Sequence, residues 1–304
     1  MSKGKEGVLF ALSAYIIWGF LPIYWKQIDG ISSYEIIAHR VLWSFVFMLL
    51  FIIVTGKWRY FKADLKFIFG SKKKMLALFT ASVVITSNWL VYIIAVNSGH
   101  ILDASLGYYI NPLISIILGV IILKERFSKV QWAAIGIVFA GVLYLTVGLG
   151  SAPVFSLYLA LSFSVYGLIK KTINIDAVYA MAVETFVLAP FALIYILYIG
   201  STGSAAFGFN TDSALMIGTG VITVIPLLLF SLGAVRIRLS LIGFLQYIAP
   251  TLMLVIGIFM YDEVFTDVHR TAYILIWGGL LIYTAAGVKA GRGREKQKAR
   301  RTVK

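Results

Sequence analysis

Apolar residues along this chain come in ten long runs, and short polar segments separate the runs. Each run is long enough, or nearly so, to cross the roughly 30 Å hydrocarbon core of a bilayer as a helix. None shows the apolar–polar alternation of a barrel strand. The pattern predicts an all-α membrane protein with ten transmembrane helices, over residues 7–26, 35–55, 75–96, 104–123, 130–148, 153–169, 179–199, 213–233, 240–260 and 271–288.

A two-part motif occurs twice in the chain, and corresponding positions of the two copies are offset by 138 residues. The copies are Tyr109–Pro112 with Lys124–Phe127, and Tyr247–Pro250 with Asp262–Phe265. Basic residues surround the first copy and acidic residues surround the second. Because basic loops of membrane proteins stay in the cytoplasm, the two copies are expected to be inserted in opposite orientations. The sequence therefore predicts two inverted five-helix repeats, residues 1–149 and 150–290, followed by a basic cytoplasmic tail, 291–304.

The composition excludes several classes of protein. With 60% apolar residues, 13% charged residues and a mean hydropathy of +0.91, the chain is too apolar for a soluble domain. It has no cysteine, so disulfides and thiolate metal sites are excluded. No phosphate-binding loop occurs, which argues against an ATP-driven pump. Acidic residues and His269 near 262–269 are interpreted as solvated loop charge rather than metal ligands, so no metal or other cofactor is expected.

The distribution of positive charge predicts the orientation. If the N-terminus is cytoplasmic, 24 of the 27 Lys and Arg residues fall on the cytoplasmic side. Such a bias predicts a plasma-membrane protein with both termini in the cytoplasm. The net charge of +14 is then an orientation signal, with anionic lipid headgroups as partners of the basic loops and tail. Binding of nucleic acid by the tail is the weaker alternative.

Polar and aromatic side chains inside the spans predict a substrate cavity. One face of the span 104–123 carries Tyr108 and Pro112, and the span 240–260 repeats this pattern with Gln246 and Pro250. A proline inside a helix removes a hydrogen bond and kinks the helix, so both prolines are predicted to allow gating movements. Close helix packing, and interhelical bonding by Asn88, remain alternatives. The predicted substrate-binding residues are Trp18, Asn88, Tyr92, Tyr108, Asn111, Tyr166, Gln246 and Tyr247.

Three ionisable residues inside spans are candidates for coupling. Glu184 is the only acidic residue deep in a span, and a proton relay is a common use of such a group, with His39 as a possible second member. Arg40 either extends outward to the headgroups, ties helices together, or contacts an anionic substrate. Arg40 and Glu184 each lie about 8 Å from opposite faces of the membrane, so they are expected to be separate features. Trp25 is interpreted as an anchor at the membrane interface.

Several short motifs together resemble a known family. They are Trp18-Gly19 with Pro22, Ala38–Arg40, Asn88-Trp89, Ala104–Tyr109 and Gln246–Thr251. They resemble the RarD proteins, bacterial members of the EamA-type family in the drug/metabolite transporter superfamily, and the resemblance covers residues 5–290. It implies ten helices in two inverted repeats, a plasma-membrane location, and a secondary carrier that exports its substrate. It also implies a central cavity lined by helices one, three, four, six, eight and nine, with Arg40 and Glu184 on more peripheral helices.

The sequence therefore predicts a secondary transporter that moves a small amphipathic metabolite or drug by alternating access, with possible proton coupling. A non-transporting membrane scaffold and an intramembrane enzyme are the competing classes. An enzyme would gather acids, bases or metal ligands at one membrane face, which this chain does not do. A scaffold would not require matched polar stripes in its two halves, which this chain has.

The inverted topology predicts that the two copies of the motif face opposite sides of the membrane. Because the chain has no cysteine, Lys129→Cys and Val264→Cys each introduce a unique thiol. We expect a membrane-impermeant thiol reagent to label Val264→Cys in intact cells and Lys129→Cys only after permeabilisation. Labelling of both positions from the same side would contradict the inverted repeat.

Overall fold

The computed structural model describes residues 3–123, 128–150, 152–173, 177–234, 236–237, 241–242 and 245–302. Lys124–Phe127 of the first motif copy and the side chains of the basic tail, 291–304, lie outside the described part. Within it the chain forms only helices: α1 (Lys3–Lys26), α2 (Ser33–Val54), α3 (Trp58–Phe69), α4 (Lys72–Asn97), α5 (Ile101–Leu123), α6 (Lys129–Leu149), α7 (Val154–Ile173), α8 (Ala177–Ser201), α9 (Thr211–Ala234), α11 (Ile248–Met260) and α12 (Asp267–Thr302).

The predicted fold class is confirmed. Six helices are long and apolar enough to cross a membrane, namely α1, α2, α4, α6, α8 and α9. Residues 154–170 of α7 and the whole of α11 are shorter apolar helices. The two remaining predicted spans, 104–123 and 271–288, lie within α5 and α12. The chain is therefore an all-α, multi-pass membrane protein.

Residues 57–74, which the sequence suggested to be a basic loop, contain the helix α3. Its apolar residues Phe61 and Ile68 are buried, whereas Arg59 and Lys62 are exposed. Apolar residues at positions 58, 61, 65 and 68 have the spacing of an amphipathic helix. The 12 residues of α3 are too few to span a bilayer, so the pattern of long apolar runs does not reveal this helix. A helix of this kind lies along a membrane surface.

The predicted span 240–260 is not one continuous helix in the described residues. Gln246 and Tyr247 form a turn, and α11 begins at Ile248. The cause is Pro250, which has no N–H to donate to the carbonyl of Gln246 and whose ring crowds that carbonyl. Pro250 therefore occupies the first turn of α11, where a missing N–H costs little. In α5, by contrast, Pro112 lies inside a helix that continues past it.

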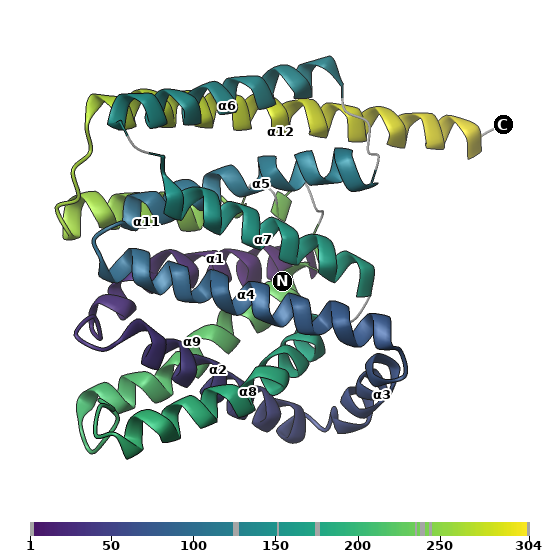
Figure 1. Ribbon diagram of the computed structural model, residues 1–304. Coiled ribbons are helices and arrows are strands. Elements are labelled where there is room, and N and C mark those ends of the chain that lie inside the picture. Colours follow the sequence, from purple (N-terminus) through teal and green to yellow (C-terminus); the bar gives the residue numbers. More distant parts are fainter. Residues whose placement is uncertain are drawn as a thin grey trace.

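Helices of the first half of the chain pack mainly against helices of the second half (Figure 1). α1 packs against α9 and α11, and α7 packs in the corresponding way against α4 and α5. Three helices of the first half pack directly against their counterparts in the second half, in the pairs α2–α8, α5–α11 and α6–α12. Of these, α6 and α12 lie side by side along one edge of the bundle (Figure 1). This pairing agrees with two inverted five-helix units, while their boundaries at 149 and 290 remain a prediction.

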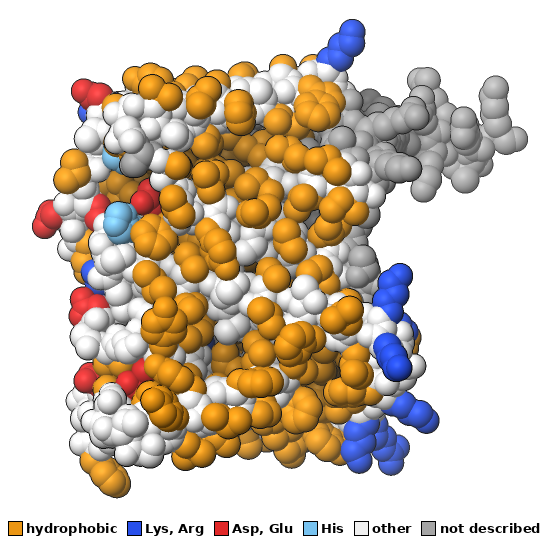
Figure 2. Space-filling view, in the orientation of Figure 1, with side chains coloured by type: hydrophobic (Ala, Val, Ile, Leu, Met, Phe, Trp, Pro, Cys, Tyr) orange, Lys and Arg blue, Asp and Glu red, His pale blue; other side chains and the backbone are white. Residues whose placement is uncertain are grey.

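Charge separates along the bundle, with a broad apolar surface between its ends (Figure 2). One end, here called the acidic end, shows Asp and Glu side chains, and it contains a hollow lined by His100, Asp103 and Asp262. The other, here called the basic end, shows Lys and Arg side chains over the region of α3 (Figure 1). An apolar belt between two charged rims is the surface that a bilayer requires.

The acidic end is held by one buried apolar cluster and by two carboxylates. The cluster joins α1, α2, α4, α5, α7, α9 and α11. Glu35 of α2 accepts hydrogen bonds from the backbone N–H groups of Ala206 and Phe207. Glu263 accepts from the N–H groups of Ile101 and Leu102 at distances of 2.6 and 2.8 Å. A carboxylate in that position stabilises the positive N-terminal end of α5.

The cap on α5 predicts a measurable cost for removing the charge of Glu263. We expect Glu263→Gln to reduce the free energy of unfolding by about 1 to 2 kcal/mol, because two N–H groups at a helix N-terminus lose a charged acceptor. Asp267→Asn is the matched control, since Asp267 is exposed and pairs only with the exposed Arg270. Thermal unfolding in detergent measures both variants. An equal midpoint for Glu263→Gln and Asp267→Asn would contradict the capping role.

Candidate functional site

Arg40 lies in the interior of the bundle at the centre of an aromatic group. Its side chain is 5% exposed, and its Nε donates to Thr223 Oγ1 of α9 at 3.0 Å. The guanidinium carbon lies 5.0 Å from the ring centroid of Trp25 and 4.3 Å from that of Trp89. The suggestion that Arg40 extends outward to the headgroups is therefore wrong. Trp25, expected at the membrane interface, is fully buried beneath this charge.

The stabilisation of Arg40 is incomplete. Taking a charge out of water costs several kcal/mol even after the protein relaxes. A desolvated cation–π contact returns about 2 kcal/mol, and a hydrogen bond by a charged group about 1.5 to 3 kcal/mol. The two rings and Thr223 thus offset much of the cost. However, the Nη1 atom of Arg40 is buried without a hydrogen-bond partner among the described residues.

Two of the predicted binding residues lie near this charge. Tyr92 and Tyr108 lie edge to face with a centroid distance of 5.9 Å, within electrostatic range of Arg40. The hydroxyl of Tyr92 is buried without a partner among the described residues. Trp18 of α1 packs against the same buried cluster that contains Trp25 and Tyr92. The fold therefore brings Tyr92 and Tyr108 close to Arg40, although Arg40 belongs to a helix that was expected to be peripheral.

Two rows of aromatic rings continue from this group along the interior. On one side, Tyr15 and Trp18 contact Phe230 of α9 at centroid distances of 5.9 and 5.7 Å. On the other side, Phe163 of α7 contacts both Tyr108 and Tyr166, at 6.4 and 6.1 Å. These rows put ring faces from four helices into the interior of the bundle.

The interior face of α7 can be identified from its spacing. Leu159, Phe163, Tyr166 and Lys170 follow at intervals of four, three and four residues, so they share one side of the helix. Leu159 belongs to the buried cluster, which shows that this side points inward. Phe163 nevertheless leaves 38% of its surface accessible. An inward aromatic ring with accessible surface is a feature of a binding-cavity wall.

Glu184 forms a buried ion pair at the far end of this aromatic row. Its carboxylate accepts from Lys170 Nζ at 2.6 Å and from the Tyr166 hydroxyl at 3.0 Å. Lys170, which the charge count assigned to a cytoplasmic loop, is a residue of α7. The expectation that Glu184 and Arg40 are separate features agrees with these partners, since each binds different residues.

His39 has other neighbours than Glu184. Its ring stacks on Phe207 of the acidic-end loop at a centroid distance of 4.5 Å. Both ring nitrogens are buried without partners in the described part of the chain. In the described part of the chain His39 and Glu184 share no hydrogen bond, and a shared proton relay remains a prediction.

Two predicted binding residues hold helices together. Asn88 Nδ2 donates to the carbonyl of Leu159 and to Ser162 Oγ, which links α4 to α7. Asn111 Oδ1 accepts from Ser164 Oγ at 2.7 Å, which links α5 to α7. Asn88 therefore has the interhelical contacts that were the alternative to substrate binding. A role for either amide in substrate binding remains a prediction.

The second motif copy contributes to a different part of the bundle. Tyr247 stacks on Tyr109 with a centroid distance of 6.0 Å, within the cluster that joins α5 to α6 and α12. Gln246 lies in the turn before α11. Neither residue contacts Arg40 through an observed interaction. Their assignment to the substrate site, and the gating roles of Pro112 and Pro250, remain predictions.

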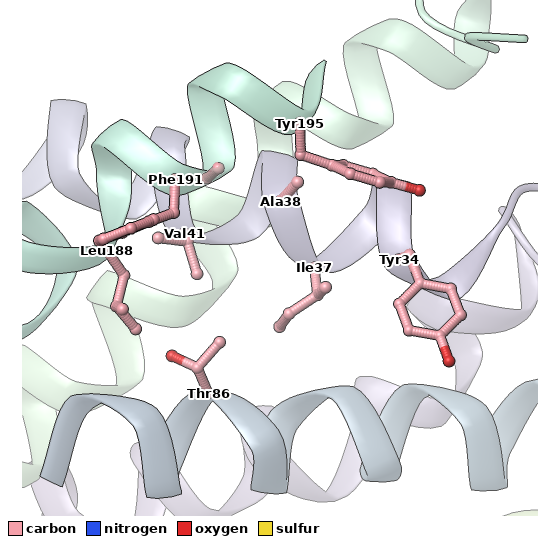
Figure 3. A pocket seen from close by; sticks show the side chains of 9 residues that line it. Tyr34, Ile37, Ala38, Val41, Thr86, Leu188, Phe191 and Tyr195 are labelled. Atoms are coloured by element: carbon pink, nitrogen blue, oxygen red, sulfur yellow. The ribbon is translucent and has the colours of Figure 1, made fainter. Parts of the chain in front are cut away.

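A lateral groove lies outside this interior site (Figure 3). It has a volume of about 230 Å³ and is lined by residues of α2, α4 and α8, including Ile37, Thr86 and Phe191. Its wall is almost entirely apolar and it contains none of the predicted site residues. The groove therefore fits the hydrocarbon environment better than it fits a polar substrate.

The acidic-end residues near 262–269 have structural partners. Glu263 caps α5, and His269 Nδ1 lies 2.9 Å from Thr266 Oγ1. Burial lowers the pKa of His269, and the charge of Asp103 opposes that shift. Among the described side chains, no three His, Asp or Glu residues form a group that could hold a metal ion.

Sequence reasoning missed several members of the site. Trp89 and Phe163 were not assigned, and Lys170 was counted only as a positive charge. Lys170 follows Tyr166 by four residues and Phe163 precedes Tyr166 by three, so helical spacing from the predicted Tyr166 could have identified both. Trp25 and Trp89 carried no such signal, because only the packing of α1 and α4 around α2 brings them to Arg40.

Comparison with known proteins places the chain among transporters. Residues 5–147 match the EamA-like transporter family. The chain is 42% identical over 291 residues to the uncharacterized transporter YojE of Bacillus subtilis, covering 95% of this chain and 96% of that protein. It is 43% identical over 290 residues to protein RarD of Salmonella typhi, covering 95% and 97%.

More distant similarities extend over the same length. The chain is 26% identical over 285 residues to the chloramphenicol-sensitive protein RarD of Pseudomonas aeruginosa, covering 93% of this chain and 94% of that protein. A crystal structure at 15% identity matches with a TM-score of 0.61 over 94% of this chain and 99% of that chain. That structure supports the fold alone.

The ion pair of Glu184 predicts non-additive stability effects. We expect Glu184→Gln or Lys170→Met alone to destabilise the protein, by as much as about 3 kcal/mol, because each leaves the other group without its partner. The double variant should lose less than the sum of the two single losses. Thermal unfolding of the four proteins in detergent measures the coupling. Strictly additive shifts would contradict a direct ion pair.

Proposed function

This chain belongs to the EamA-like transporter family, within its RarD group, and on that premise we propose that it is a secondary transporter that exports small amphipathic molecules. The proposed substrates are metabolites or drugs with an aromatic or apolar body and at least one polar group. The proposed mechanism is alternating access between the two sides of the cytoplasmic membrane, with both termini in the cytoplasm.

One observation carries this proposal, namely the pair of aromatic rows in the bundle interior. Tyr15, Trp18 and Phe230 line one side, and Tyr108 and Phe163 line the other. They come from helices of both halves of the chain. Ligand sites of this kind combine apolar or aromatic walls with a few polar groups that orient the ligand. Transporters built from inverted repeats bind their substrates at the interface of the repeats.

The distribution of buried contacts supports alternating access. The apolar cluster at the acidic end joins seven helices around Trp25 and Met253, so the interior is closed on that side. Because helix contacts of one half have counterparts in the other half, we propose a second arrangement in which the opposite end closes. The turn before α11 supplies a break in a spanning segment, which is where such transporters commonly place substrate contacts.

The basic end is proposed to face the cytoplasm, where its Lys and Arg side chains meet anionic headgroups. α3 lies at this end and carries Lys62 over the ring of Trp58, at 5.4 Å from the centroid. Proton coupling is proposed through Glu184, which ends the aromatic row formed by Tyr108, Phe163 and Tyr166. A carboxylate inside a membrane protein commonly belongs to such a relay.

Flux into liposomes tests the proposed function. The reconstituted protein should transport at least one member of a panel of aromatic metabolites, amino acids and phenicol drugs. We expect Tyr108→Ala to reduce this flux by about threefold to tenfold through loss of aromatic contacts. Tyr144→Ala is the matched control, because Tyr144 lies exposed on α6. Absence of flux for the whole panel, in both directions, would count against a carrier.

The same assay separates coupling from transport. If Glu184 carries the proton, Glu184→Gln should transport with no dependence on an imposed pH gradient. A variant that keeps the full gradient dependence removes Glu184 from the coupling mechanism without contradicting transport.

A further inference from the structure

We propose that Arg40 binds the carboxylate of a net-negative organic acid, so that the preferred substrates are aromatic monocarboxylates rather than neutral or zwitterionic compounds. This inference rests on the proposed transport function and names its substrate class. The supporting observations are that the buried guanidinium of Arg40 has no counter-charge among the described residues, and that the groups around it can donate hydrogen bonds.

The first argument is the missing counter-charge. Arg40 is 5% exposed, yet the ion pairs formed by described residues do not include it. Its Nε is bound to Thr223, which is neutral, and its Nη1 has no partner. Charged side chains in the interior of a membrane protein are ordinarily paired or mark a ligand pathway. A substrate anion would supply both the charge and the acceptor that Arg40 lacks.

The second argument is that the neighbouring unpaired groups can donate. The Nε1–H group of Trp25 can only donate a hydrogen bond. It belongs to the ring that contacts the guanidinium, and it is buried without a partner among the described residues. The Tyr92 hydroxyl is also unpaired and lies within electrostatic range of Arg40. A carboxylate has two oxygens that accept several hydrogen bonds, so it fits a site formed by a guanidinium, an indole N–H and a phenol.

The third argument separates acids from zwitterions. An amino acid would bring an ammonium group, and an ionised carboxylate of the protein would be needed to balance its charge. The two fully buried carboxylates in the described part are already engaged: Glu35 by the backbone N–H groups of Ala206 and Phe207, and Glu184 by Lys170. The single charge of Arg40 therefore matches a substrate with one net negative charge.

The fourth argument concerns the body of the substrate. Tyr108 lies within electrostatic range of Arg40 and packs on Tyr92, and the row continues through Phe163 to Tyr166. A carboxylate held by Arg40 would thus place an attached aromatic ring near this row, where stacking and edge contacts are favourable.

Equilibrium binding to the full-length protein in detergent tests the site without requiring transport. The probes are phenylacetate, its neutral amide phenylacetamide, and zwitterionic phenylalanine, with quenching of tryptophan fluorescence as the readout because Trp25 and Trp89 contact Arg40. We expect phenylacetate to bind roughly 10- to 100-fold more tightly than phenylacetamide or phenylalanine, since the amide lacks the charged acceptor and the ammonium group of phenylalanine has no counter-charge in the site. Equal binding of the acid and the amide would overturn the proposal without any variant.

Two variants assign the preference to Arg40. Arg40→Gln should remove the preference for the acid over the amide, while Arg40→Lys, which keeps the charge but loses the planar fork, should retain part of it. Arg270→Gln is the matched control, because Arg270 is an exposed arginine at the acidic end and should leave binding unchanged. Size-exclusion profiles and melting temperatures establish that each variant is folded. A folded Arg40→Gln protein that keeps the preference contradicts the assignment.

Flux measurements distinguish this inference from the proposed function. Preferential binding of phenylacetate with no flux of any panel member would contradict the transporter and support the Arg40 site. Flux of phenylacetamide equal to that of phenylacetate, unchanged in Arg40→Gln, would support the transporter and overturn the Arg40 site. Preferential flux of the acid that is lost in Arg40→Gln supports both.

Discussion

The interior of this bundle is organised around one positive charge that hydrocarbon cannot solvate. The side chain of Arg40 points from α2 toward the centre of the bundle. There it contacts the rings of Trp25 and Trp89 and donates a hydrogen bond to the hydroxyl oxygen of Thr223. These contacts stabilise the charge without neutralising it. The cost of a buried, unbalanced guanidinium is tolerated in membrane proteins mainly where it serves a ligand or an ion pathway. The site is thus defined by a buried positive charge without a counter-charge among the described residues, as well as by the aromatic rings around it.

The two ends of the molecule are held by different interactions, and this difference has mechanical consequences. At the acidic end an apolar cluster is reinforced by carboxylates that bind backbone N–H groups, as Glu35 and Glu263 do. Along the interior, in contrast, Phe163 leaves accessible ring surface, and Glu184 and Lys170 bind each other across two helices. An interior held by pairwise contacts can be rearranged at a lower cost than a close-packed cluster. Such a contrast suits a protein whose two halves move against each other.

Proline affects the two corresponding helices differently, although the motif is the same. Pro112 lies inside α5, which continues past it, and bonds between Asn111 and Ser164 link this helix to α7. Pro250 lies in the first turn of α11, after a turn at Gln246. The inverted repeat is therefore approximate in the described residues. The two halves share their pattern of helix pairs, but they differ at the proline, which lies inside α5 in one half and in the first turn of α11 in the other.

The sequence by itself determined the class of protein, an all-α multi-pass membrane protein, because hydrocarbon imposes length and apolarity on each segment separately. The inverted relation of the two halves remains a prediction from the repeated motif and the loop charge. The sequence also identified Arg40 and Glu184 as unusual, since an ionisable residue within a span is conspicuous without any structure. Their partners depended on the tertiary structure: Thr223 and the two tryptophans for Arg40, and Lys170 for Glu184. Contacts between distant segments depend on how each helix is rotated about its axis and which helices become neighbours, and no local pattern encodes either.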